Sequence, residues 1–193
     1  MNFLDLVLSD LIQAKIINSK VVKINFYIFI YYFLRSKTCR IHTFVRLRSK
    51  NKLLAYIAKK YLDRYFIEIG RNTQIGEYFW MPHPRCIIIA SDVTIGNHVH
   101  VGQYVTIGGN FKRIKQLPND KIQKLPIIGN KVMIHPGAVI GGPVTLGSDI
   151  IVGANAVITK DISSNTICFG QNQTARKKIT IPDEGGKYEI IGK

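Results

Sequence analysis

The chain has 193 residues, 46% of them hydrophobic and 20% charged, which suits one globular domain with a smaller appendage. This composition excludes an intrinsically disordered chain. The formal net charge is +15, and residues 1–66 hold thirteen Lys/Arg against three Asp/Glu, so the excess lies mainly there. Three cysteines far apart in the chain, Cys39, Cys86 and Cys168, argue against a disulfide framework and lack the spacing of a zinc site.

Residues 1–66 are predicted to be helical. Apolar residues recur there at spacings of three and four, first from Leu4 to Ile12 and again from Leu53 to Leu62, as one buried helix face requires. The first ten residues lack the basic start of a signal peptide. The most apolar run, 24–34, is too short to span a bilayer as a helix. We therefore expect a cytoplasmic protein.

An aromatic run followed by clustered cations lies between these two stretches. Six aromatic residues fall between Phe26 and Phe33, and seven Lys/Arg follow between Arg35 and Lys52. Two interpretations stay open. The region packs against the rest of the protein or a neighbouring subunit, or its rings and cations contact anionic headgroups at the inner face of the membrane. The two can coexist.

From residue 67 to 165 the sequence repeats with a period of six residues. An aliphatic residue opens most units, and a glycine often follows it directly. Examples are Ile75-Gly76, Ile95-Gly96, Ile107-Gly108, Ile140-Gly141 and Leu146-Gly147. The phase slips by two residues between the units that start at Ile87 and Ile89. Periods of 3.6 or 2 do not explain this pattern, whereas stacked coils of short strands with tight corners do.

The sequence thus divides into three parts. Residues 1–66 form a basic-aromatic helical region, 67–165 form the coil domain, and 166–193 form a C-terminal tail. The polar, basic stretch 110–126 lacks the six-residue phase and is predicted to be a loop extruded from a coil. Because stacked coils leave their ends open, we expect the helical region to cover one end.

The repeat resembles that of the hexapeptide transferases over about half of the chain. This resemblance implies a mainly β fold, a left-handed parallel β-helix of triangular section with a short N-terminal helical region. It also implies an acyltransferase that forms a homotrimer, or a hexamer of two trimers, with active sites between neighbouring subunits. The acyl donor would be acetyl-CoA, and no metal is implied.

From Phe66 to Gly109 the sequence resembles the serine acetyltransferases without a gap. Glu68 falls on the family's acid that orients the catalytic histidine, and His83 falls on that histidine. The segment Gln103-Tyr-Val-Thr-Ile-Gly-Gly109 falls on the family's Q-x-V-T-[Leu/Ile]-G-G segment. The resemblance implies that His83 is the general base, that Glu68 fixes its tautomer, and that the Gly109 N–H stabilises the oxyanion.

Further contacts follow as expectations from the same resemblance. The residues expected to contact the acceptor are Trp80, Arg85 and Gln103. The residues expected to hold acetyl-CoA are Gly108, Gly109, Ala138, Ala154, Ala156, Arg176 and Lys177. Small corner residues would let the pantetheine approach the backbone, and the two cations would meet the CoA phosphates.

Two positions depart from the serine acetyltransferases. The family has an acid directly before the catalytic histidine, where this chain has Pro82. The family also has an Arg-His-Pro that contacts serine, where this chain has Lys124-Leu125-Pro126. These departures lead to the expectation of an O-acetyltransferase that acts on a bacterial surface carbohydrate of a capsule, O-antigen or exopolysaccharide. The alternative is serine O-acetyltransferase.

Other classes of function are weaker predictions. A non-catalytic β-helix that binds a polymer would share the repeat but would not need His83. Nucleic acid is not expected as a partner, because the charge comes with no recognition motif. A metal site is not expected, because His98 and His100 have no third ligand at a suitable spacing.

Overall fold

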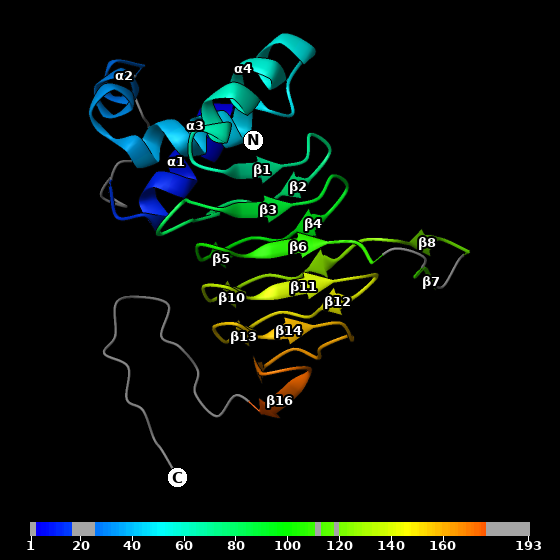
Figure 1. Cartoon of the computed structure of the whole chain (residues 1–193). Coiled ribbons are helices and arrows are strands. Elements are labelled where there is room, and N and C mark those ends of the chain that lie inside the picture. The colour runs from blue at the N-terminus through cyan, green and yellow to red at the C-terminus, as the bar shows by residue number, and fades with distance from the viewer. Residues whose placement is uncertain (1–2, 17–25, 111–112, 118–119, 177–193) are drawn as a thin grey trace.

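The computed structural model describes residues 3–16, 26–110, 113–117 and 120–176. Four helices come first, and a stack of short strands follows them (Figure 1). The helices are α1 (Phe3–Gln13), α2 (Phe26–Arg35), α3 (Lys37–Leu47) and α4 (Lys52–Asp63). Ser36 caps the start of α3 and Asn51 caps the start of α4, each with a side-chain oxygen that accepts a hydrogen bond from the first helical turn. The predicted helical N-terminal region is confirmed.

The strands form a left-handed parallel β-helix with three faces, as predicted. The first face contains β1 (Ile67–Ile69), β3 (Ile87–Ile89), β6 (Thr106–Gly108), β11 (Val139–Gly141) and β14 (Val157–Ile158). The second contains β5 (His100–Val101), β10 (Met133–Ile134), β13 (Ile151–Val152), β15 (Thr166–Phe169) and β16 (Gln173–Arg176). The third contains β2 (Gln74–Ile75), β4 (Thr94–Ile95), β9 (Ile127–Ile128) and β12 (Thr145–Leu146).

The period of six arises because each repeat supplies one buried aliphatic side chain and one corner. Ile107, Ile140 and Ile158 lie in register on successive coils and are fully buried. Glycine is required at some corners by close backbone approach. A Cβ on Gly129 would lie 2.4 Å from the Gly147 carbonyl oxygen.

The two-residue phase slip corresponds to a bulge in one corner of the first coil. Trp80 pairs with His100, twenty residues later, whereas the corner residues Cys86 and Tyr104, both at positive φ, are eighteen residues apart. The two extra residues therefore lie between Trp80 and Cys86. This is the segment that contains His83.

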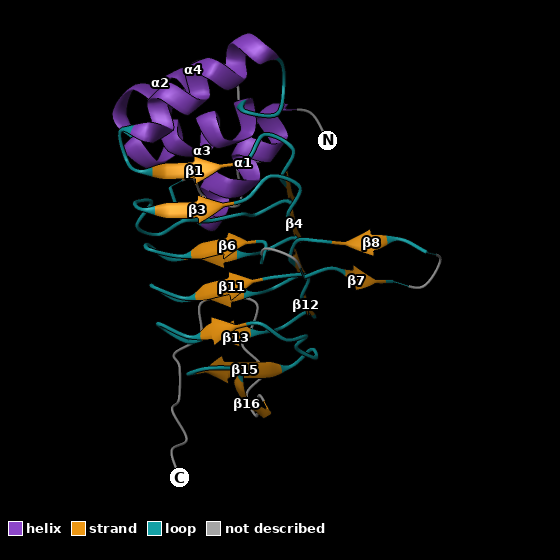
Figure 2. Ribbon diagram, turned by 45° about the vertical axis from the view of Figure 1, so that its right-hand side comes forward, coloured by secondary structure: helices purple, strands orange, loops and turns teal. Residues whose placement is uncertain are grey.

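An arm projects sideways from the middle of the coils, as Figure 2 shows. It contains the antiparallel pair β7 (Lys115–Gln116) and β8 (Ile122–Gln123), inside the stretch 110–126 that was predicted to be an extruded loop. Lys115 forms an ion pair with Asp161, and the buried Gln123 amide donates a hydrogen bond of 2.9 Å to the Val144 carbonyl. Both contacts attach the arm to the later coils.

The helices close the first coil through a buried polar cluster. The Asp10 carboxylate accepts hydrogen bonds from Arg46 at 2.7 and 2.9 Å and from the Phe79 N–H at 3.0 Å. Arg46 also donates to the carbonyls of Ile75 and Gly76. The cluster thus satisfies backbone groups of the first coil that have no preceding coil to pair with. We call helices α1 to α4 the cap.

Arg48 extends the same closure. Its guanidinium donates to the carbonyls of Gly70, Val45 and Thr73. Burial, and secondarily the nearby Arg46, lowers the pKa of Arg48 to about 10, so that it stays charged at neutral pH.

The outer side of the cap exposes apolar stripes beside cations. On α2 the stripe is Tyr27, Ile30, Tyr31 and Leu34, and on α4 it is Leu53, Tyr56 and Ile57. Arg35 lies over the Tyr31 ring, and Lys60 lies over the Tyr56 ring. In the described part of the chain, no helix has the length and hydropathy needed to cross a membrane.

At the other end, β15 continues the coils and β16 turns back along it in antiparallel pairing. These two strands lie within the stretch 166–193 that the sequence assigns to a tail. The antiparallel strand covers the last coil's edge on the second face. The division into parts at residues 66 and 165 stays a prediction.

Candidate functional site

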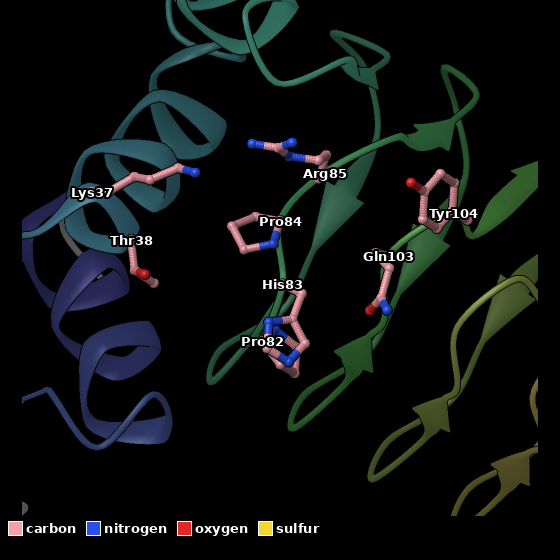
Figure 3. Close-up of a pocket in the computed structure, with 8 residues that line it drawn as sticks. All are labelled: Lys37, Thr38, Pro82, His83, Pro84, Arg85, Gln103 and Tyr104. Carbon is pink, nitrogen blue, oxygen red and sulfur yellow. The ribbon is translucent and has the colours of Figure 1, made fainter.

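A pocket of about 320 Å³ lies where the cap meets the bulged corner of the first coil (Figure 3). Its lining comes from α3, from the bulge and from the corner of the next coil. The lining residues are Lys37, Thr38, Pro82, His83, Pro84, Arg85, Gln103 and Tyr104. Of the predicted site residues, the structure brings His83, Arg85 and Gln103 together here.

His83 projects because the bulge lifts it out of the coil. Pro82 and Pro84 flank it, and each proline ring restricts the backbone on its side. Pro84 is buried, whereas the His83 side chain is exposed to the pocket. Among the described residues no group hydrogen-bonds to the imidazole, so both ring nitrogens are available to a ligand.

Lys37 reaches the pocket from the first turn of α3. Ser36 is the single extended residue between α2 and α3, and its side chain accepts a hydrogen bond of 3.2 Å from the Cys39 N–H, which fixes where α3 begins. The Lys37 ammonium lies 4.5 Å from the centroid of the Tyr65 ring, a cation–π distance. Tyr65 precedes the first coil, so this contact positions Lys37 against the coils.

Gln103 and Tyr104 form the wall below the bulge. Tyr104 turns the corner at φ 60°, and its N–H donates a hydrogen bond to the Arg85 carbonyl. The Gln103 side-chain oxygen Oε1 is buried and has no hydrogen-bond partner. A buried acceptor without a donor is unfavourable, so a ligand with an N–H or O–H group would stabilise it.

Glu68 lies on β1, outside the pocket lining. It shares a column on the first face with Ile88 and Thr106, and its carboxylate is exposed. No hydrogen bond links Glu68 to His83 in the described structure. The pairing of these two side chains stays a prediction.

Gly109 also lies apart from His83 within one chain. Tyr104, which lines the pocket, precedes β6, whereas Gly108 ends β6 and Gly109 follows it. Gly109 is exposed, and no described residue accepts a hydrogen bond from its N–H. The N–H is thus available to stabilise an oxyanion, but at the opposite end of the strand from His83.

Trp80 lies on the second face and does not line the pocket. Its ring meets His100 edge-on, with ring centroids 5.2 Å apart, and His100 Nε2 lies 2.6 Å from Gln13 Nε2 on α1. Burial, and secondarily His98, lowers the pKa of His100. This cluster joins the cap to the second coil.

The residues expected to hold acetyl-CoA lie on the later coils. Ala138 and Ala156 are fully buried and point into the core, so only the backbone of their corners is open to a ligand. Ala154 is exposed beside the corner residue Asn155. Arg176 ends β16, and Lys177 lies outside the described residues.

The pocket contains residues that the sequence did not indicate as functional. Lys37 and Thr38 belong to the helical region, and only the packing of the cap onto the coils places them beside His83. Tyr104 lies inside the segment Gln103–Gly109, but nothing in the sequence separated it from its neighbours. The only feature of the sequence that could have drawn attention to Lys37 and Thr38 is that they are polar residues at the start of a helix, directly after the capping residue Ser36.

The cysteines do not contribute to the pocket lining. Burial raises the pKa of the Cys39 and Cys168 thiols to about 11, which keeps both protonated at neutral pH. Within the described ranges, no three His, Cys, Asp or Glu side chains gather as a metal ion would require.

Comparisons with known proteins identify the repeat and the fold. Residues 126–160 match the family described as bacterial transferase hexapeptide (six repeats). A serine acetyltransferase of Staphylococcus aureus is 30% identical over 127 residues, which is 65% of this chain and 56% of that protein. A serine acetyltransferase of Staphylococcus epidermidis is 33% identical over 111 residues, 56% of this chain and 49% of that protein. The chain spans about half the length of the curated relatives it matches.

Solved structures share the fold. The serine acetyltransferase of Neisseria gonorrhoeae superposes with a TM-score of 0.73 at 18% identity, covering 93% of this chain and 69% of that one. Serine acetyltransferase isoform 3 of Entamoeba histolytica, in complex with cysteine, superposes with a TM-score of 0.64 at 24% identity, covering 97% of this chain and 62% of that one.

These comparisons overturn the expectation of a surface carbohydrate as acceptor. The relatives are serine acetyltransferases, which favours the alternative. The expectation was wrong because it took the loss of two family contacts, at Pro82 and at 124–126, as evidence for a different acceptor. The structure instead places Lys37 and Arg85 beside His83, where the sequence did not predict two converging cations. The chain thus has a hexapeptide repeat and a left-handed β-helix fold, and 65% of it is similar in sequence to a serine acetyltransferase.

Proposed function

We propose that this protein is an acetyltransferase that transfers the acetyl group of acetyl-CoA to the hydroxyl of L-serine, with His83 as general base. One observation carries the proposal. His83, which aligns with the catalytic histidine of the serine acetyltransferases, projects into a pocket. The identity of 30% to a serine acetyltransferase supports the acceptor.

In the proposed reaction His83 removes the proton from the acceptor hydroxyl as the oxygen attacks the thioester carbonyl. The oxygen–carbon bond forms, the carbon–sulfur bond breaks, and the imidazolium returns the proton to the departing CoA sulfur. Histidine suits this task because its pKa lies near neutral pH. The Gly109 N–H stabilises the negative charge on the carbonyl oxygen during the transfer.

We propose that the active unit is a homotrimer with sites between subunits. The supporting observation is that Gly109 and the pocket lie at opposite ends of β6, so a neighbouring copy would bring its Gly109 to this chain's His83. The outward column of the first face also exposes Ile88 and Val139, at 47% and 37%, which a neighbour would cover. Sedimentation equilibrium giving one 21.8 kDa chain would contradict the trimer.

Placement of the acetyl-CoA along the later coils stays part of the proposal. The exposed corner at Ala154 and the backbone of the corners at Ala138 and Ala156 support it.

We further propose that the protein lies in the cytoplasm and that its cap contacts an anionic membrane there. The exposed apolar stripes of α2 and α4, with Arg35 and Lys60 beside them, support it. Co-sedimentation with vesicles of phosphatidylcholine and phosphatidylserine tests it, and equal recovery with vesicles of phosphatidylcholine alone would count against it.

His83→Ala tests the proposed function. We expect turnover of acetyl-CoA with L-serine, followed by release of the CoA thiol, to fall by about 10²- to 10⁴-fold, the usual contribution of a positioned general base. His98→Ala is the matched control, because His98 is also an exposed histidine of the coils but stacks on Tyr78 away from the pocket. Turnover by His83→Ala that equals turnover by His98→Ala would refute the role of His83.

A further inference from the structure

The lining of the His83 pocket carries positive charge without a balancing carboxylate. Lys37 and Arg85 are its two cationic residues besides the titratable His83, and the lining contains no Asp or Glu. Figure 3 shows the two head groups pointing toward each other, Lys37 from α3 and Arg85 from the coil corner. Converging like charges repel, and a bound anion between them would remove that repulsion.

Neither cation is neutralised elsewhere in the described structure. Lys37 contacts the π face of Tyr65, which holds the ammonium without compensating its charge. Arg85 forms no ion pair or side-chain hydrogen bond with any described residue. Its guanidinium fork therefore keeps all its donors for a planar, two-oxygen acceptor such as a carboxylate.

The opposite wall offers the complementary group. Gln103 Oε1 is a buried acceptor with no partner, and Figure 3 shows Gln103 beside His83 on the wall away from Lys37. An ammonium group of a ligand would donate to this oxygen. The pocket therefore presents a base, a pair of cations and an unpaired acceptor from three separate directions.

We infer that Lys37 and Arg85 bind the carboxylate of an amino-acid acceptor, and that Gln103 Oε1 accepts a hydrogen bond from its amino group, while the hydroxyl faces His83. This inference rests on the proposed function. It assigns acceptor specificity to a residue of the helical cap, Lys37, and to the bulged corner, Arg85.

The experiment compares L-serine with L-serinamide, which keeps the hydroxyl and the amino group but lacks the carboxylate charge. KM for each acceptor is measured by CoA thiol release with the full-length protein, wild type, Lys37→Met and Arg85→Gln. Binding of each compound to the same proteins without acetyl-CoA is measured by calorimetry. Lys52→Met is the matched control, because Lys52 is the first residue of α4 as Lys37 is of α3, and it lies outside the pocket lining.

We expect the wild type to prefer L-serine, and each pocket variant to raise the KM and Kd for L-serine by about tenfold, as the loss of a partly solvated charged contact gives. The preference over L-serinamide should shrink by the same factor. Lys52→Met should keep the wild-type preference. Gln103→Leu should weaken binding of both compounds, because both carry the amino group.

Two results separate this inference from the proposed function. Turnover of L-serine with unchanged KM and Kd in both pocket variants, or a rise in KM for acetyl-CoA only, would overturn the carboxylate site and leave the function standing. Absence of turnover by the wild type, with L-serine binding that both variants weaken, would refute the function and support the site. L-serine binding that neither variant weakens, without turnover, would overturn both.

Discussion

In the coils, buried residues pair with equivalents one coil away, as Ile140 does with Ile158 and Ile134 with Val152, eighteen residues later. In the cap, Asp10 contacts Arg46 and Phe79, which are 36 and 69 residues away. The coils are therefore specified by a repeated local pattern, whereas the cap depends on a few polar contacts between distant segments. The candidate site lies at the joint, and its lining comes from both.

The candidate site forms at an irregular corner of the coils, where the cap packs against it. The regular coil corner at Asn155 offers the small side chain of Ala154 to solvent. The two extra residues of the bulge lift His83 outward, and the cap, which closes the first coil, supplies the facing wall with Lys37. Closure of the open coil end and formation of the pocket are thus achieved by the same packing.

Removing the charge of Asp10 should have the largest effect on stability. Asp10→Asn leaves the buried Arg46 guanidinium without its carboxylate, so we expect the free energy of unfolding in urea to fall by about 3–5 kcal/mol. Asp63→Asn, which breaks the exposed ion pair with Lys59, should cost less than about 1 kcal/mol. Equal losses for the two variants would show that the cap does not depend on the buried cluster.

Gly129 and Gly141 hold the same position in their repeats but differ in how closely other atoms approach them. A Cβ on Gly129 would meet the backbone of Gly147, whereas one on Gly141 would meet nothing within 4 Å. We expect Gly129→Ala to lower the free energy of unfolding by about 1–3 kcal/mol, and Gly141→Ala to change it by less than about 0.5 kcal/mol. Similar values for the two would mean that the corners yield easily to an added methyl group.

The joint should show a small dependence of stability on pH through His100. Its pKa in the folded protein is lowered from 6.5 by burial, so below about pH 6.5 the unfolded chain binds more protons at this site. Stability should therefore be lost as the pH falls through and below that value. In His100→Gln, urea unfolding at pH 5 and pH 8 should differ less than in the wild type. If the difference in unfolding free energy between pH 5 and pH 8 were the same in His100→Gln as in the wild type, His100 would not contribute to the pH dependence of stability.

The sequence predicted the coils because they depend on a local pattern, whereas the role of His83 as general base follows from a resemblance and stays a prediction. The period of six identified the β-helix. Its slip of two residues was assigned between Ile87 and Ile89, whereas the structure places the two extra residues between Trp80 and Cys86. The stretch 110–126 was predicted to be an extruded loop. Its β7–β8 pairing was not predicted, because two-residue strands leave no period to detect.

Lys37 and Thr38 could not be predicted as part of the site. Their position depends on Arg46 and Arg48 binding carbonyls of the first coil, which no local pattern encodes. The acceptor was mispredicted for a related reason. Missing family contacts at Pro82 and at 124–126 were visible in the sequence, whereas the cation that the cap brings to the pocket, Lys37, was not.

We propose that acetyl-CoA donates its acetyl group directly to the hydroxyl of L-serine, with His83 as the general base. The most direct measurement is nuclear magnetic resonance of the product formed from carbon-13-labelled acetyl-CoA and L-serine by the wild type and by His83→Ala. We predict a labelled ester on the serine hydroxyl with the wild type, formed at least about a hundredfold more slowly by His83→Ala. Absence of the ester with the wild type, or its formation at the same rate by both proteins, would contradict the claim.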